Sequence, residues 1–280
     1  MISLPFAKMN GAGNSILVVD ERGRPHAMTG DAARRIGEGR LDFDQMMVIG
    51  DATRAGVDAE VRIFNRDGSR AGACGNGTRC VAWMMLEGAT REDLALDIEG
   101  TEVSCRRDAE ARFTVDMGAP GFDWRALPLG HAVDPDAADL GAVLPELGLP
   151  RPSVLGMGNP HAVFFVPDAR AIDLEGYGGR LEHDAMFPDR ANISFAEVAS
   201  RDHIRLRTWE RGAGATLACG SAACATLVAA ARRGLTGRRA TVSQRGGDLV
   251  ITWRADDHVL MTGPVELEER GLLDLADLAA

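Results

Sequence analysis

The chain contains two similar segments, each of which leads to a cysteine followed by glycine. Residues 65–77 read NRDGSRAGACGNG, and residues 210–222 read ERGAGATLACGSA. An offset of 145 residues relates Cys74 to Cys219, and the same offset relates Asn14 to Asn159. Because 145 residues is about the length of one domain, the repeat indicates a duplicated and fused domain with one thiol in each copy.

The secondary-structure pattern is also repeated. Strands are predicted at residues 59–65 and 203–210, where apolar residues alternate with charged ones, and each runs through a glycine-containing loop into a helix, at 76–87 and at 221–233. Both helices are apolar nearly all round, so we expect them to be buried. We also expect strands at 16–20, 45–49 and 265–268, a helix at 31–38 capped by Asp31, and a weak helix after residue 268.

A region rich in Pro, Gly, Ala and Asp, residues 118–152, connects the two copies. We place the boundary near Pro120. The expected domains are an N-terminal half, residues 1–119, joined by residues 264–280, and a C-terminal half, residues 120–263.

Charge and composition exclude several classes of function. The net charge of −10 disfavours binding to nucleic acid or to an anionic membrane, which both need a basic surface. No apolar stretch is long enough for a membrane span, and the first residues do not resemble a secretory signal, so we expect a cytoplasmic protein. Lys8 is the only lysine, and its surroundings do not resemble a pyridoxal-phosphate site. The odd number of cysteines, five, favours reduced thiols.

Each repeated cysteine is predicted to lie at the start of a helix. The free N–H groups and partial positive charge there lower the pKa of a thiol and also bind carboxylates. The glycine after each cysteine lets a ligand approach the backbone closely. Cys74 and Cys219 can therefore each offer a thiol beside an anion cradle.

Two thiols on opposite faces of one α-carbon are what the inversion of a stereocentre needs. One thiolate removes the proton from one face while the other thiol supplies a proton to the opposite face, and the roles exchange in the reverse direction. The N–H groups aimed at the carboxylate stabilise the carbanion. The repeat thus predicts an epimerase or racemase that uses no cofactor and no metal.

Other interpretations remain open at this point. Cys80, Cys105 and Cys224 are expected to be core residues, and the spacing of Cys74 and Cys80 is too long for a common zinc motif. A redox dithiol lacks the C-x-x-C spacing. The asparagines Asn14, Asn65, Asn159 and Asn192 are either turn formers or substrate ligands. Arg211 is a candidate carboxylate ligand, its mate Arg66 is a candidate solvated charge, and His161 and Glu210 are candidate orienters of a nearby thiol.

Several motifs together resemble the diaminopimelate epimerase family. They are KMNGAGN, FNRDGSRAGACGNGTRC, MGNPHAV, FPDRANISF, HIRLRTWERGAGATLACGSAACA and HVLMTGPVE, in order over almost the whole chain. The resemblance implies an α/β (α+β) fold with two pseudo-symmetric halves, each a curved mixed sheet wrapped around a central helix. It implies interconversion of L,L- and meso-diaminopimelate without a cofactor, a small diamino dicarboxylic acid as the ligand, and a homodimer.

The resemblance also assigns residues. Cys74 and Cys219 are implied as the acid/base pair, and His161 and Glu210 as polar groups beside them. The implied substrate-binding residues are Asn14, Gln45, Asn65, Gly75, Asn76, Asn159, Asn192, Glu210, Arg211, Gly220 and Ser221. Ser15, Ala215 and Ala222 depart from the commonest family pattern, although none removes a group that the reaction needs.

Two further hypotheses belong to other classes. A proline racemase-like enzyme, or an isomerase of the phenazine-pathway type, is the enzymatic alternative. The polar set Asn65, Asn159, Asn192 and Arg211 favours a substrate with a charged distal end over proline. A duplicated amino-acid-binding module without turnover is the non-enzymatic alternative, and the presence of both thiols argues against it.

Overall fold

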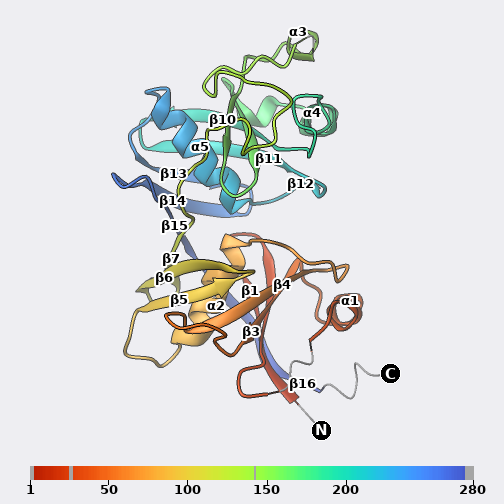
Figure 1. Cartoon of the computed structure of the whole chain (residues 1–280), viewed down its shortest axis with the longest axis vertical. Helices are drawn as coiled ribbons and strands as arrows, with labels where there is room; N and C mark the ends of the chain where they lie inside the picture. Colours follow the sequence, from red (N-terminus) through yellow and green to blue (C-terminus); the bar gives the residue numbers. More distant parts are fainter. Residues whose placement is uncertain (1–2, 25–27, 142, 275–280) are drawn as a thin grey trace. The chain divides into compact units, whose positions relative to one another are not determined.

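The computed structural model describes residues 3–24, 28–141 and 143–274 (Figure 1). The chain divides into two compact units. Unit 1 comprises residues 1–116 and 262–280, and unit 2 comprises residues 117–261. Each unit is a mixed sheet with helices packed on it, and each is described by itself below.

Unit 1 has one mixed sheet with the strand order β16-β1-β2-β3-β4-β5-β6-β7. Its strands are β1 (Ser3–Asn10), β2 (Ser15–Asp20), β3 (Gln45–Gly50), β4 (Ala59–Asn65), β5 (Asp93–Ile98), β6 (Thr101–Ala109), β7 (Arg112–Asp116) and β16 (Glu266–Asp274), and its helices are α1 (Gly30–Glu38) and α2 (Gly75–Leu86). β15 (Val259–Pro264) crosses the boundary between the units. Helix α2 is the crossover between the parallel strands β4 and β5, which brings its start to the end of β4.

Strands β2 and β3 of the unit 1 sheet are buried on both faces. Helix α1 shares an apolar cluster with Met46, Val48 and strand residues around them. Met47 points to the other face, where a Cβ added at Gly77 of α2 would lie only 2.5 Å from its sulfur. Alternation of side chains therefore explains why β3, with the sequence QMMVIG, is an apolar run rather than an alternating strand.

Unit 2 repeats this topology in the order β14-β13-β11-β10-β9-β8. Its strands are β8 (Ser153–Gly156), β9 (Pro160–Phe165), β10 (Asn192–Ser200), β11 (His203–Glu210), β12 (Gly214–Ala215), β13 (Arg239–Gln244) and β14 (Gly247–Trp253). Its helices are α3 (Val143–Leu147), η1 (Ala169–Ala171), α4 (Leu174–Glu182) and α5 (Gly220–Arg232). Parallel and antiparallel pairings follow each other as in unit 1, and α5 is the crossover between the parallel strands β11 and β13.

Helix α5 is the inner helix of unit 2, and it contacts the strands from β8 to β14 that form the sheet path. Helix α4 packs on β10 and β11, where Phe195 and Trp209 belong to a second apolar cluster. The contact is close, since a Cβ added at Gly178 would lie 2.3 Å from the indole of Trp209. The strands that lead to the candidate site are thus held from both sides.

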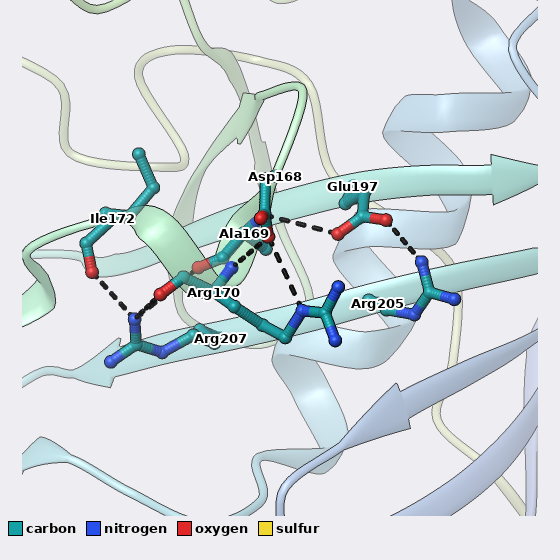
Figure 2. A network of polar contacts seen from close by, with 7 residues as sticks. All are labelled: Asp168, Ala169, Arg170, Ile172, Glu197, Arg205 and Arg207. Carbon is teal, nitrogen blue, oxygen red and sulfur yellow. Dashed lines mark hydrogen bonds and ion pairs between the residues drawn. The ribbon is translucent and has the colours of Figure 1, made fainter.

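Polar contacts fix the segment before α4 to the same sheet (Figure 2). Nη1 of Arg207 on β11 donates to the carbonyl of Ile172 at 2.7 Å and lies near two earlier carbonyls of the η1 turn. Glu197 on β10 accepts from the backbone N–H of Ala169 and pairs with Arg205. Arg205 and Arg207 lie two residues apart on one face of β11. Arg207 contacts the η1 segment directly, and Arg205 contacts Glu197, which accepts from the η1 backbone, so both arginines help to attach η1 to the sheet.

Most expected elements are present, with three corrections. Helices α2 and α5 begin one residue before their predicted starts, so that Cys74 and Cys219 are the N-cap residues. The cap of α1 is Thr29, whose hydroxyl accepts from the N–H of Ala32, and not Asp31, which lies within the first turn. The weak helix after residue 268 is wrong as far as residue 274, because β16 pairs with β1 throughout that stretch, and residues 275–280 lie outside the described residues. In the described part of the chain, no helix is long and apolar enough to cross a membrane.

Candidate active site

In unit 1 the thiol of Cys74 caps the helix that follows it. Its backbone is extended, with φ −153° and ψ 93°, and its Sγ accepts from the N–H of Gly77 at 3.2 Å. Its carbonyl accepts from both the N–H and the hydroxyl of Thr78, each at 2.8 Å. The sulfur is half-buried and lies among the free N–H groups of the first turn, where a thiolate is stabilised.

Asn14 lies beside this thiol. Its Oδ1 is 3.7 Å from Cys74 Sγ, and its amide nitrogen donates to Asp44 at 3.0 Å. The same Asp44 oxygen accepts from the N–H of Ser15. The loop before Asn14 approaches α2 closely, since a Cβ on Gly11 would lie 3.1 Å from the carbonyl oxygen of Asn76. Asp44, which sequence reasoning passed over, therefore holds Asn14 in place.

Three other predicted residues lie near the ends of β3 and β4 or at the start of α2. Gln45 and Asn65 are partners across the two strands, and the amide of Gln45 donates to Asn65 Oδ1 at 3.1 Å. Asn76 is 4% exposed, and its side-chain oxygen has no hydrogen-bond partner among the described residues. Asn76 thus presents a buried amide close to the Cys74 thiol in sequence and in space.

In unit 2 the thiol of Cys219 is held differently. Cys219 is also an extended N-cap residue, but its Sγ makes no capping hydrogen bond to the helix and lies 3.5 Å from the hydroxyl of Ser221. Its backbone N–H donates to Oε1 of Gln244, at the end of β13, at 2.8 Å. The residue is only 6% exposed. Gln244 is a contact that sequence reasoning missed.

The pKa of Cys219 corrects the expectation of a lowered value. Burial raises this pKa well above the ordinary value for a thiol, and the negative charge of Glu210 raises it further. The hydroxyl of Ser221 acts in the opposite direction and is outweighed. At neutral pH Cys219 is therefore a thiol that can donate a proton, rather than a thiolate.

His161 and Asn159 form a pair in this unit. His161 is completely buried on β9, and its Nε2 is 2.8 Å from Asn159 Oδ1, so that Nε2 carries the proton. Burial, together with the positive charge of Arg211, lowers the pKa of His161 to about 3. His161 is thus a neutral hydrogen-bonding group at physiological pH.

Asn192, Glu210 and Arg211 are gathered at the ends of β10 and β11. Asn192 is the register partner of His161, and its Oδ1 accepts from the N–H of Arg211 at 2.9 Å. Glu210 accepts from the hydroxyl of Thr216 at 2.5 Å. The Arg211 side chain is exposed, with one nitrogen 3.3 Å from the carbonyl of Asp189.

The remaining predictions have simple outcomes. Cys80, Cys105 and Cys224 are buried core residues as expected, and burial raises the pKa of both Cys80 and Cys105 to about 12. Arg66 is exposed and pairs with Asp42, which confirms its interpretation as a surface charge. Of the predicted residues, the structure thus places Asn14 beside Cys74 in unit 1, and Ser221 and Glu210 beside Cys219 in unit 2.

Comparison with known proteins identifies the family. The family model described as diaminopimelate epimerase matches residues 6–122 and 153–268. A diaminopimelate epimerase of Methylocella silvestris is 52% identical over 98% of this chain and 97% of its own length, and one of Brucella canis is 47% identical over 97% and 91%.

Solved structures with low sequence identity share the fold. A predicted epimerase of Pseudomonas aeruginosa has a TM-score of 0.70 at 18% identity, covering 96% of this chain and 99% of its own. A hydroxyproline epimerase of Agrobacterium vitis, with bound trans-4-hydroxy-L-proline, has a TM-score of 0.64 at 14% identity, covering 97% and 91%. With relatives at about half identity along its whole length and the family model matching most of its residues, this chain belongs to the diaminopimelate epimerase family.

Proposed function

We propose that the protein interconverts L,L- and meso-diaminopimelate with Cys74 and Cys219 as its acid/base pair. It is an isomerase of the diaminopimelate epimerase family. The observation that carries the proposed mechanism is the equivalence of the two thiols. Each is the N-cap residue of the crossover helix that follows the same strand of the same topology.

The two helix starts supply the anion cradle. Helices α2 and α5 have 12 and 13 residues, long enough for a helix dipole, and both begin at a glycine. The backbone N–H groups of Gly75, Asn76, Gly220 and Ser221 bind the α-carboxylate. Removal of the α-proton places negative charge on that carboxylate, and these groups stabilise the charge as it forms.

The raised pKa of Cys219 supports one first direction of proton transfer. Cys219 holds its proton, because burial and Glu210 raise its pKa. Cys74 lies against the N–H of Gly77, which stabilises a thiolate. Cys74 Sγ therefore takes the α-proton from one face, and Cys219 gives its proton to the opposite face. After one turnover Cys74 is a thiol and Cys219 a thiolate, which is the state that the reverse reaction needs.

The remaining polar residues read the rest of the substrate. Unit 1 contributes Asn14, Gln45 and Asn65, and unit 2 contributes Asn159, Asn192, Glu210 and Arg211. Arg211 is exposed and can form a bidentate contact with the distal carboxylate. His161 is neutral and orients Asn159.

The proline-like alternative is less well supported. The hydroxyproline epimerase shares only the fold at 14% identity, whereas the relatives at about half identity are diaminopimelate epimerases. A proline-type substrate also has no distal charge for Arg211 and the amides to bind.

A cytoplasmic location and a homodimer belong to the same proposal. β16 is the outermost strand of the unit 1 sheet among the described residues, and it carries the strongly exposed Leu272. An open strand with an exposed apolar side chain is suited to contact with a second copy.

Substitution of the cysteines tests the mechanism. We expect Cys74→Ala and Cys219→Ala to lower kcat for meso-diaminopimelate formation by at least about a thousandfold, since each removes an acid/base group. Cys224→Ala, which removes a buried thiol of α5 outside the site, is the matched control and should remain active. Chiral chromatography measures the product, and circular dichroism checks the fold. Wild-type activity in either site variant would refute the two-thiol mechanism.

The test needs no added pyridoxal phosphate or metal. The only lysine, Lys8, pairs with Glu268 at 3.5 Å. A requirement for either addition would count against the proposed chemistry.

A further inference from the structure

Gln244 connects the end of one strand to the backbone of Cys219. It is the last residue of β13, which pairs in parallel with β11, and its Oε1 accepts from the Cys219 N–H at 2.8 Å. Because the partner is a backbone donor, the amide must present its oxygen here, and its orientation is fixed by chemistry. Cys219 is therefore attached to the sheet by a group outside its own loop and helix.

The nitrogen of the Gln244 amide, in contrast, does not add to stability. Its Nε2 is buried and has no hydrogen-bond partner among the described residues. A buried donor without a partner costs stability, and an apolar side chain of similar length would avoid that cost. The bond to Cys219 is thus the contribution that distinguishes glutamine from an apolar residue at this position.

The first half has a different residue at the equivalent place. In unit 1, Val61 of β4 pairs with Ile98, the last residue of β5, and Ile98 turns back on Thr101. In unit 2, Gln244 is likewise the last residue of its strand and pairs with Gly247 across the hairpin. The sheet register therefore matches Gln244 to Ile98, which is buried and has no side-chain acceptor.

The two halves also hold their thiols by different contacts. Cys74 is fixed through its sulfur, which accepts from Gly77, whereas the sulfur of Cys219 makes no capping hydrogen bond and lies 3.5 Å from the hydroxyl of Ser221. The backbone of Cys219 therefore has a larger share in setting the orientation of its side chain. Gln244 is the side chain that fixes that backbone from outside.

We propose that Gln244 is a positioning residue for Cys219. By holding the Cys219 N–H, it sets the direction in which the sulfur points and so the geometry of proton transfer at the second thiol. Its contact with Cys219 is to the backbone N–H. The inference rests on the proposed function, in which Cys219 is one of the two acid/base groups.

The test compares variants that remove or withdraw the acceptor. Gln244→Met keeps the length and removes the amide oxygen, and Gln244→Asn keeps the amide but draws it back. Ser243→Ala is the matched control, because the neighbouring Ser243 bonds to His203 and not to Cys219. Rates are measured with L,L-diaminopimelate, and peptide mass spectrometry follows alkylation of each cysteine by iodoacetamide.

Loss of the acceptor should reduce kcat rather than weaken substrate binding. We expect Gln244→Met and Gln244→Asn to lower kcat by roughly tenfold to a hundredfold, with KM changed by less than about twofold, because a misplaced thiol slows the chemical step. Ser243→Ala should stay within about threefold of the wild-type kcat. Alkylation of Cys219 should become several times faster in the Met and Asn variants, while the fully buried Cys224 stays unlabelled.

Two outcomes would overturn the inference. One is a wild-type kcat in either Gln244→Met or Gln244→Asn, and the other is a Ser243→Ala variant as slow as Gln244→Met. Should Gln244→Met fail to fold, Gln244→Asn decides the question. An active Cys219→Ala enzyme refutes the proposed mechanism itself, whereas an inactive Cys219→Ala beside a fully active Gln244→Met refutes only the role of Gln244.

Discussion

The start of α2 and the start of α5 are built on one plan but prepare their cysteines differently. Cys74 is half-buried, and its sulfur accepts a backbone N–H and lies near Asn14. Cys219 is almost fully buried, its sulfur lies near Ser221, and its backbone is tied to Gln244. The topology determines where each thiol is placed, whereas burial, together with the charge of Glu210, raises the pKa of Cys219.

The charge at the preceding strand end is the clearest difference. The offset of 145 residues relates Asn65, a neutral amide, to Glu210, a carboxylate. The Asn65 side chain is engaged by Gln45 and Ser69, whereas the charge of Glu210 raises the pKa of Cys219. The second half thus carries a negative charge beside its thiol at the position where the first half carries a neutral amide.

The largest expected effect is on the stability of unit 2, where helix α4 packs on β11. Gly178→Ala should destabilise unit 2 by about 2–3 kcal/mol, because the added methyl meets the rigid indole of Trp209, whose N–H is held by Glu182. Gly77→Ala is the matched change in unit 1 and should cost less than about 1 kcal/mol, since it meets the flexible side chain of Met47 and gains helix propensity. Thermal unfolding measures both. A Gly178→Ala protein as stable as wild type would contradict the packing of α4 on β11.

A smaller effect is expected on the titration of the second thiol. Glu210→Gln removes a negative charge beside Cys219, so the thiolate becomes less unfavourable and the pKa of Cys219 falls. At a fixed pH below that pKa, alkylation of Cys219 should become faster, because a larger fraction of the thiol is ionised. Glu197→Gln is the control, because Glu197 pairs with Arg205 elsewhere in the unit. An unchanged pH profile in Glu210→Gln would show that this carboxylate does not tune the thiol.

The smallest expected effect is on the rate of cysteine alkylation, and it should differ between substitutions of the equivalent residues Asn14 and Asn159. Asn14 contacts the thiol of its own half, whereas Asn159 contacts His161. Asn14→Ala should increase the rate of Cys74 alkylation by about threefold, because it uncovers the sulfur, while Asn159→Ala should leave Cys219 alkylation unchanged. Equal effects of the two variants on their cysteines would mean that the halves do not differ in this contact.

The sequence predicted the features that arise from periodicity and repetition. Strands β4 and β11 have their predicted bounds, and both helices after the cysteines were found to within one residue. The cap of α1 was misplaced because Thr29 and Asp31 are both good caps two residues apart. The end of β16 was missed because its pairing with β1 joins segments more than 250 residues apart, and local propensity does not report such a contact.

The sequence predicted that both cysteines lie at helix starts, as the structure has them, but it did not predict the pKa of Cys219. The position of each cysteine at a helix start indicates a lowered pKa, but that position does not show how deeply the sulfur is buried. Cys219 is buried and faces Glu210, and these two effects outweigh the helix start. The sequence did not indicate a role for Gln244 either, because its contact with Cys219 joins residues that are 25 positions apart and separated by a helix.

The central claim is that the two thiols act on opposite faces of one α-carbon. The most direct test is the reaction of L,L-diaminopimelate in deuterium oxide, with both isomers analysed during the first few per cent of conversion. Two separate acid/base groups predict that the meso product carries one solvent deuterium at the inverted carbon while the remaining substrate carries none. A product that keeps the hydrogen of the substrate would show that a single group moves the proton and would contradict the account.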